Sequence, residues 1–170
     1  MASLRNLILN DRYFILPNQA GLIHLTGKVL EHIFKYAQVR KSDKEAGGQI
    51  FSENPDSSVV SVSVATGPYK EDFRSRNSFN PCLNNINKDR EYFFNKGLYA
   101  VGLWHTHPQL HPKPSHEDKI TTQKYLSASK GEMNGFLQII IGNTMSSSNI
   151  TVWLASNYVS DQWIQLKEES

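Results

Sequence analysis

The first apolar runs of the chain are short and lie on either side of a turn-forming segment. Residues 13–16 and 22–25 are rich in aromatic and aliphatic side chains, with a proline and a glycine bounding the polar residues between them. This arrangement predicts two strands joined by a turn. After Thr26, apolar residues recur at three- and four-residue steps, which predicts an amphipathic helix to about Gln38 with Thr26 as its N-cap.

The middle of the chain changes between strand-like and polar patterns. Residues 47–51 begin with two glycines and continue into an apolar run, and residues 59–65 alternate valine with small or polar residues. Both patterns predict strands. Residues 69–82 are polar with scattered aromatic side chains, which indicates an extended surface segment with a short strand near Phe79. We expect a helix to follow over residues 83–96.

The second half of the chain has the clearest periodic segments. The apolar run 98–104 predicts a buried strand, and residues 115–128 predict a helix. Further strands are expected at 136–141 and 150–155, with a last one near 162–166. This order of strands and helices allows a mixed sheet with helices on both sides.

Composition narrows the class of protein. With 170 residues, of which 39% are hydrophobic, the chain fits one domain over residues 1–170 with a core of its own. The 18 basic and 16 acidic residues are spread along the chain and give a net charge of +2, so no basic block points to nucleic acid. Cys82 is the single cysteine, and neither a signal-peptide core nor a membrane-length apolar run occurs. We therefore expect a cytoplasmic protein without nucleic-acid or membrane partners.

One stretch has the spacing of metal ligands. His105 and His107 follow the apolar strand, and residues two apart in a strand point to the same face, so their imidazoles should emerge side by side. After seven intervening residues, Ser115 begins a Ser-x-x-Asp sequence that puts Asp118 in the first turn of the next helix. Three such ligands leave the fourth position of a tetrahedral zinc site open, as in catalytic sites.

Ordinary structural roles stay open for the same residues. Ser115 and Asp118 form a plausible capping box, and the Ser115 hydroxyl could serve both as a cap and in catalysis. His111 and His116 are competing candidates for metal ligation. Glu45 stands before a pair of glycines that would let the backbone approach another group closely. Taken alone, however, Glu45 is a weak candidate, because glutamates on surface loops are mostly solvated.

Together these residues resemble a known family. Glu45, His105-x-His107 and Ser115-x-x-Asp118 are similar to the JAMM signature of the JAB/MPN zinc metalloprotease family. The likeness, over roughly residues 22–155, also includes the following segments: Glu45-Ala46-Gly47-Gly48, Arg74-Ser75-Arg76 with Phe79, Gly102-x-Trp104-His105-Thr106-His107-Pro108 and Pro112-x-Pro114-Ser115. These segments resemble a bacterial branch that includes the deconjugating isopeptidase of CBASS anti-phage operons. That branch commonly has acidic residues where this chain has Leu103 and Gln109.

The resemblance implies a fold and a metal centre. The fold would be of the α/β (mixed α+β) class, a JAB/MPN-type twisted mixed sheet flanked by helices with cytidine-deaminase-like layering. One zinc ion per chain would be held by His105, His107 and Asp118. Glu45 would carry a proton from water to the leaving amine, and Ser115 would donate a hydrogen bond to the oxyanion.

The substrate side of the resemblance is less specific. Arg74, Arg76 and Phe79 are candidates for one wall of a groove that holds an extended C-terminal tail, although the two arginines could equally be plain surface charges. The implied activity is hydrolysis of the (iso)peptide bond after the C-terminus of a conjugated protein. That protein would be a CD-NTase, the cyclic-oligonucleotide synthase that an E1/E2-like enzyme conjugates in CBASS defence.

Three other functions remain to be weighed. A deubiquitinase-like peptidase could process or remove a bacterial ubiquitin-like protein in another defence operon. A metal-free MPN scaffold would only bind partners, and the complete set of candidate ligands argues against it because scaffold members typically lose them. A DNA-associated role, known for a JAB group with similar ligand spacing, gains no support from the near-neutral charge.

Overall fold

The computed structural model describes residues 9–128, 135–156 and 163–170. Its elements in chain order are β1 (Arg12–Ile15), the 3-10 helix η1 (Pro17–Gln19), β2 (Leu22–Leu25), α1 (Gly27–Phe34), β3 (Gly47–Ser52), β4 (Val59–Ala65), β5 (Phe73–Ser75), β6 (Ser78–Asn80), α2 (Leu83–Phe94), β7 (Tyr99–Thr106), α3 (His116–Ala128), β8 (Gly135–Ile141), β9 (Ile150–Ser156), β10 (Trp163–Gln165) and β11 (Lys167–Glu168). None of the described helices is long and apolar enough to cross a membrane.

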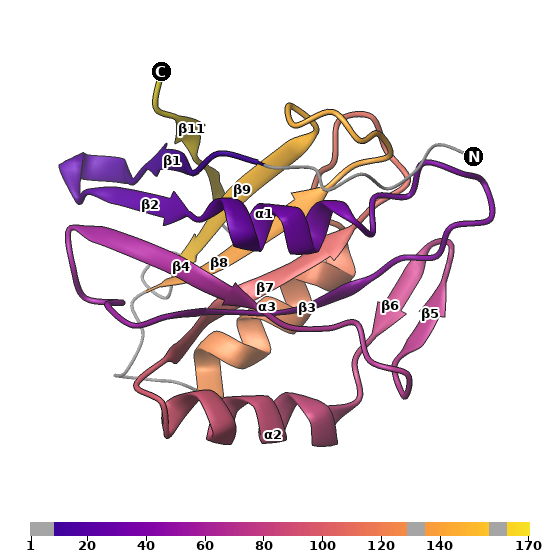
Figure 1. Cartoon of the computed structure of the whole chain (residues 1–170), viewed down its shortest axis with the longest axis horizontal. Helices are drawn as coiled ribbons and strands as arrows, with labels where there is room; N and C mark the ends of the chain where they lie inside the picture. The colour runs from indigo at the N-terminus through magenta and orange to yellow at the C-terminus, as the bar shows by residue number, and fades with distance from the viewer. Residues whose placement is uncertain (1–8, 129–134, 157–162) are drawn as a thin grey trace.

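The strands form one large mixed sheet and a separate hairpin (Figure 1). The strand order of the large sheet is β10-β9-β8-β7-β3-β4-β2-β1-β11, and β5 pairs with β6. Two neighbouring pairs, β2 with β4 and β7 with β8, are parallel, whereas the other neighbours are antiparallel. The expected mixed α+β fold class with a mixed sheet is therefore confirmed.

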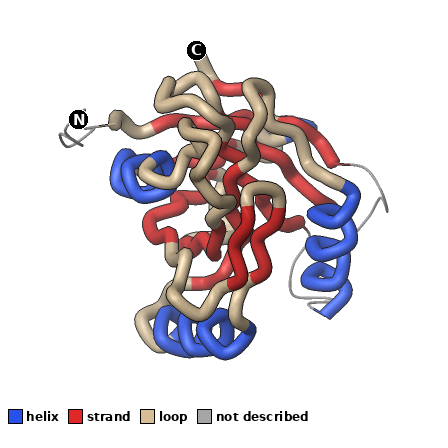
Figure 2. The backbone as a smooth tube through the Cα atoms, turned by 90° about the vertical axis from the view of Figure 1, so that its right-hand side faces the viewer, coloured by secondary structure: helices blue, strands red, loops and turns tan. Residues whose placement is uncertain are grey.

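Helices cover both faces of the large sheet. Figure 2 shows the strands between α1 on one side and α3 on the other, with α2 at one end. Leu30, Ile33 and Phe34 of α1 pack into the main core with Trp104 and other buried strand residues. On the opposite face, a smaller apolar cluster joins α3 to β8, β9 and β7. The β3 strand runs through the middle of the sheet, so all six of its residues are buried.

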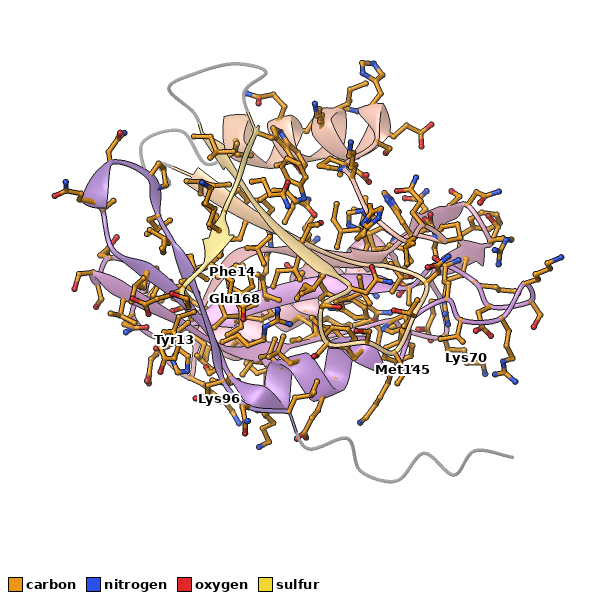
Figure 3. The ribbon with its side chains drawn as sticks, turned by 90° about the horizontal axis from the view of Figure 1, so that it is seen from above. Tyr13, Phe14, Lys70, Lys96, Met145 and Glu168 are labelled. Carbon is orange, nitrogen blue, oxygen red and sulfur yellow. The ribbon has the colours of Figure 1, made fainter. Side chains whose placement is uncertain are left out.

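The last described residues connect the two ends of the sheet. The Leu166 backbone N–H donates to the Val152 carbonyl on one side, and β11 pairs with β1 on the other. Figure 3 shows Phe14 and Glu168 next to each other, and these two residues face one another in the register. The Arg12 guanidinium holds the Glu168 carboxylate through two bonds of 2.7 and 2.6 Å. The sequence predicted a strand near 162–166 but not this second pairing.

Two predicted elements differ from the structure. The α1 helix ends at Phe34 instead of continuing to about Gln38. Its end tightens into three-residue turns, because Tyr36 and Ala37 donate to the carbonyls of Ile33 and Phe34. The segment 69–82 contains two short strands, β5 and β6, where the sequence predicted one near Phe79.

Candidate active site

Two imidazoles meet where β7 ends. His105 is the next-to-last residue of β7, and His107 continues its line, with its backbone N–H donating to the Ile141 carbonyl. Their Nε2 atoms lie 3.1 Å apart, as the alternation of a strand predicts. Trp104 points to the other face, where its indole N–H donates to the Thr66 carbonyl. The two histidines therefore present ring nitrogens to one point.

Asp118 reaches the same point from the start of α3. The Ser115 backbone N–H donates to Asp118 Oδ2 at 2.6 Å, and the Asp118 backbone N–H donates to Ser115 Oγ at 3.1 Å. This reciprocal pair is a capping box, which starts the helix and fixes the carboxylate. The same Oδ2 atom lies 3.3 Å from His105 Nε2 and 3.4 Å from His107 Nε2.

The three donor atoms fit a tetrahedral metal ion. With ligand bonds of about 2.0–2.1 Å, the ligand atoms of tetrahedral zinc stand roughly 3.3 Å apart. The observed edges of the triangle formed by His105, His107 and Asp118 are 3.1, 3.3 and 3.4 Å. These are also the residues that form a possible metal-binding cluster among the described residues, which His111 and His116 do not join.

The electrostatics of the triangle favour a bound cation. Burial acts to raise the pKa of the Asp118 carboxyl, but hydrogen bonds from His105 and His107 outweigh it and hold that pKa well below its usual range. Burial acts to lower the pKa of the His107 imidazole, but Asp118 and Glu45 outweigh it and raise that pKa. Asp118 therefore stays ionised near neutral pH, and a proton competes with a metal ion for the His107 ring more strongly than at an ordinary histidine.

Glu45 stands beside the triangle, in the loop that leads into the strand next to β7. It precedes β3, only 7% of its surface is exposed, and its Oε1 lies 4.0 Å from His107 Nε2. Burial raises the pKa of the Glu45 carboxyl to about 7, although the charge of His107 opposes the shift. A carboxyl with that pKa can accept and release a proton near neutral pH. Glu45 is thus a buried group next to the cluster, not a solvated surface residue.

The β5–β6 hairpin fixes the backbone at Glu45. The Glu45 N–H donates to the Ser75 carbonyl at 2.7 Å, and the Arg74 Nε donates to the Glu45 carbonyl at 2.7 Å. Arg74 Nη2 also reaches the Lys44 carbonyl at 3.3 Å. Arg76 donates through Nη1 to the carbonyls of Arg40 and Lys41. The two arginines, predicted as groove residues, hold the loop that leads to Glu45, and their part in substrate binding stays a prediction.

A buried polar network behind Glu45 was missed in the sequence. Thr106 Oγ1 accepts from the Ala46 N–H at 3.0 Å and donates to Gln38 Oε1 at 3.1 Å. Gln38 in turn donates to the carbonyls of Asp43 and Arg76 at 3.2 and 2.8 Å. Thr106 lies between the two histidines in the sequence, so a polar residue on the core side of that strand was the available signal.

The glycine pair and Phe79 close one side of the site. A Cβ atom on Gly47 would lie 2.6 Å from the Phe79 ring and 2.7 Å from the Trp104 carbonyl oxygen. A Cβ on Gly48 would collide with the Thr66 carbonyl. The expected close approach at this glycine pair is therefore confirmed. Phe79 lies over the backbone next to Glu45, at the edge of a small cavity that also touches His105.

Comparison with known proteins gives a family and a fold. The family model described as prokaryotic homologs of the JAB domain matches residues 28–155. A curated Pseudomonas aeruginosa (strain BWHPSA011 / Pa011) protein named CD-NTase/cGAS isopeptidase is 29% identical over 124 residues, which are 71% of this chain and 77% of that protein.

Two solved structures share the fold. The solution structure of a Desulfitobacterium hafniense protein aligns with a TM-score of 0.56 and 18% identity, covering 86% of this chain and 88% of that one. The solution structure of a Salinibacter ruber (strain DSM 13855) protein aligns with a TM-score of 0.52 and 17% identity, covering 83% and 86%. At these identities the likeness shows the fold alone.

Proposed function

Because this chain belongs to the family of prokaryotic homologues of the JAB domain, we propose that it is a zinc-dependent isopeptidase. The observation that carries the proposal is the triangle of His105, His107 and Asp118 donor atoms with the buried Glu45 next to it. Amide hydrolysis needs an activated water, a group that moves a proton to the leaving amine, and a donor for the oxyanion. The residues around the triangle offer each of these.

The ligand set suits zinc. Two neutral imidazoles and a carboxylate are a common zinc donor set in enzymes, and three protein ligands leave one position for water or substrate. A zinc ion held there would supply Lewis acidity, which polarises a carbonyl group and lowers the pKa of water. Asp118 contributes the charge that favours the divalent ion, since its carboxyl stays ionised near neutral pH.

Glu45 is the proposed proton carrier. Its carboxylate accepts a proton from the attacking water and hands it to the nitrogen that leaves. Burial raises the pKa of this carboxyl above its ordinary value, so the protonated form that donates to the leaving nitrogen is easier to reach than in an exposed glutamate. The buried position next to His107 keeps the carboxylate within reach of the reacting water.

Ser115 is the proposed oxyanion donor. Its Oγ accepts a hydrogen bond from the Asp118 backbone, which orients the side chain and leaves the hydroxyl proton to be donated. A hydroxyl held by a helix start needs little reorganisation when the carbonyl oxygen becomes negative. The capping box would thus serve the fold and the reaction together.

We propose that the substrate is the C-terminal tail of a conjugated CD-NTase. The support is the named activity of the Pseudomonas aeruginosa relative, which shares 29% identity with this chain. In this role the chain would reverse the conjugation that an E1/E2-like enzyme carries out in CBASS defence. The second candidate is a deubiquitinase-like activity on a bacterial ubiquitin-like protein, which requires the same residues but a different tail.

The decisive experiment pairs cleavage with metal content. A fusion joining the tail of the CD-NTase from the same operon to a reporter is incubated with wild type and with Glu45→Ala. We expect wild type to cut at the junction, and Glu45→Ala to keep about one zinc per chain while losing at least about 100-fold in rate. Zinc-loaded wild type that leaves this tail intact but cuts a ubiquitin-like fusion would move the substrate to the second candidate. A protein that binds no zinc would contradict the proposal itself.

A further inference from the structure

A small cavity opens beside the metal-ligand triangle. Its volume is about 80 Å³, and Glu45, His105 and Asp118 form its edge. Phe79, Ile86 and Thr121 are among its other lining residues. By the measure that one water needs about 10–15 Å³, the cavity has room for a small side chain. Because its edge includes all three of these polar residues, whatever enters it lies next to the reacting bond.

The register of the sheet defines the floor of the cavity. Leu103 on β7 and Gln138 on β8 are partners in the parallel pairing, and both line the cavity. Leu103 lies two residues before His105, so the two side chains share a face of the sheet. The cavity therefore extends from the triangle across the face that α2 and α3 cover.

Gln138 has a side-chain oxygen that is an unsatisfied hydrogen-bond acceptor among the described residues. Only 2% of its surface is exposed, and its Nε2 donates to Thr122 Oγ1 at 2.7 Å. Its Oε1 is buried and has no hydrogen-bond partner among the described residues. A buried carbonyl oxygen without a donor destabilises the fold, because it has lost its hydrogen bonds to water. Gln138 lines the cavity, and a donor brought within hydrogen-bond distance of Oε1 there would satisfy this oxygen.

A second glutamine, paired with the same Leu103 across the sheet, has a purely structural role and serves as a comparison. Gln49 of β3 is the partner of Leu103 on its other side. Its Nε2 donates to the Ile86 carbonyl at 3.1 Å, and its Oε1 accepts from Arg90 Nε at 2.7 Å. Both polar atoms of the Gln49 side chain are thus hydrogen-bonded within the fold. In Gln138, which lines the cavity, the side-chain oxygen has no donor among the described residues.

We propose that this cavity is a subsite for the side chain of the last tail residue, and that Gln138 selects a hydroxyl-bearing side chain there. The inference rests on the proposed isopeptidase function. In an isopeptide bond the leaving nitrogen belongs to a lysine stem that continues into the target protein. The side chain nearest to the bond on the other side is that of the last tail residue. Serine and threonine combine small size with an O–H donor for Gln138 Oε1.

The test compares tails that end in threonine and in valine, which have the same shape but differ in the hydroxyl. For zinc-loaded wild type we expect the threonine tail to be cleaved with about tenfold higher kcat/KM. In Gln138→Met, which keeps the length but lacks the acceptor, we expect the threonine-to-valine ratio to fall to one or below. The ratio is taken within each variant, so a general loss of rate cancels. Gln165→Met, at an exposed position on β10, is the matched control and should keep the wild-type ratio.

A second variant and a binding measurement test the subsite independently of the proposed isopeptidase activity. Leu103→Phe would fill the floor, and we expect it to lower cleavage of both tails about tenfold relative to a glycine-ended tail. Affinities of the two tail peptides for zinc-loaded Glu45→Gln are compared by fluorescence anisotropy. Equal affinities, or equal cleavage of both tails by wild type, would overturn the subsite and leave the isopeptidase intact. Failure to cleave any tail, with threonine still bound more tightly, would instead contradict the proposed function.

Discussion

Two acidic residues reach the histidine pair in opposite ways. Asp118 is placed by local structure: its partner Ser115 is three residues away, and the bonds between them are those of a helix start. Glu45 is placed by remote structure: Arg74 is 29 residues away, and Thr106, which holds the next backbone N–H, is 60 residues from Ala46. Asp118 therefore depends on one turn of helix, and Glu45 depends on the complete fold.

The difference suits the two proposed tasks. A metal ligand is drawn to its ion by a strong bond, so a short local support is sufficient to hold Asp118. A proton carrier makes only hydrogen bonds to the reacting atoms, so its position must be fixed by the protein before substrate arrives. The dense set of bonds around the Glu45 backbone, from the hairpin and from Thr106, is what such a task requires.

The largest effect is expected from the locally placed residue. Asp118→Asn keeps the size and a cap acceptor but removes the ligand charge. Mutation of a residue that only hydrogen-bonds to a metal ligand typically weakens metal binding about 10- to 100-fold. Loss of a direct ligand should weaken zinc binding by more than this, and activity should fall with it. Zinc content by mass spectrometry and cleavage rate, measured on the same samples, check this. Full zinc content in the variant would mean that Asp118 is only a helix cap.

The remote support of Glu45 is tested by Arg74→Ala. We expect kcat to fall about 10- to 100-fold with KM and zinc content unchanged, because Glu45 loses one of the two hydrogen bonds that hold its backbone but substrate contacts remain. Arg74→Lys, whose single ammonium group lacks the forked geometry that reaches both carbonyls, should restore part of the rate.

Arg76→Ala is the matched control for Arg74, since Arg76 holds residues 40 and 41 at the start of the loop, farther from Glu45. We expect a smaller loss of kcat from it. A rise in KM with kcat unchanged in either variant would favour the groove role that the sequence suggested.

Threonine-to-valine changes compare the structural support of Glu45 with that of Asp118. Thr106→Val leaves the buried Ala46 N–H and Gln38 Oε1 without their partner, so we expect the free energy of unfolding to fall by about 1–3 kcal/mol. Thr151 donates to the Pro112 carbonyl in the loop before Asp118, and it is only partly buried. Thr151→Val should therefore cost less. Urea unfolding of the two variants measures the difference, and equal losses would contradict the contrast between the two supports.

The smallest effect concerns the pH dependence of zinc binding. The pKa of His107 is raised above its ordinary value of 6.5, so the population of the imidazolium form increases as pH falls through that raised pKa. Zinc needs the neutral ring, so affinity should be full above the raised pKa and fall by up to about tenfold per pH unit below it. Asp118 stays ionised and adds no dependence in this range. Competition with a chelating dye between pH 5.5 and 8 (chosen to bracket the ordinary histidine pKa) follows this.

Glu45 should shift that profile. Its charge helps to raise the pKa of His107, so Glu45→Gln should move the loss of affinity to lower pH. A profile that does not move would show that the two groups are not coupled in solution.

The same contrast explains what the sequence could predict. The histidine pair follows from strand alternation and Asp118 from helix periodicity, so the geometry of the triangle could be inferred from spacing alone. From its own surroundings Glu45 was only a weak candidate, and the resemblance gave it its role, because its supports come from other parts of the chain. Gln38 had been assigned to the end of a helix, and only the tertiary structure shows its side chain bonded to Thr106. The subsite at Gln138 depends on the parallel pairing of β7 with β8, which no local pattern encodes.

The pairing of β1 with β11 has a consequence for the order of synthesis. Arg12 and Glu168 are 156 residues apart, so at about 5–20 residues per second they leave the ribosome roughly 8 to 30 s apart. During that time β1 has its β2 partner but an open outer edge, which another nascent chain could join. Translation speed and chaperone supply should therefore affect the yield of this protein more than the stability of its finished fold would suggest.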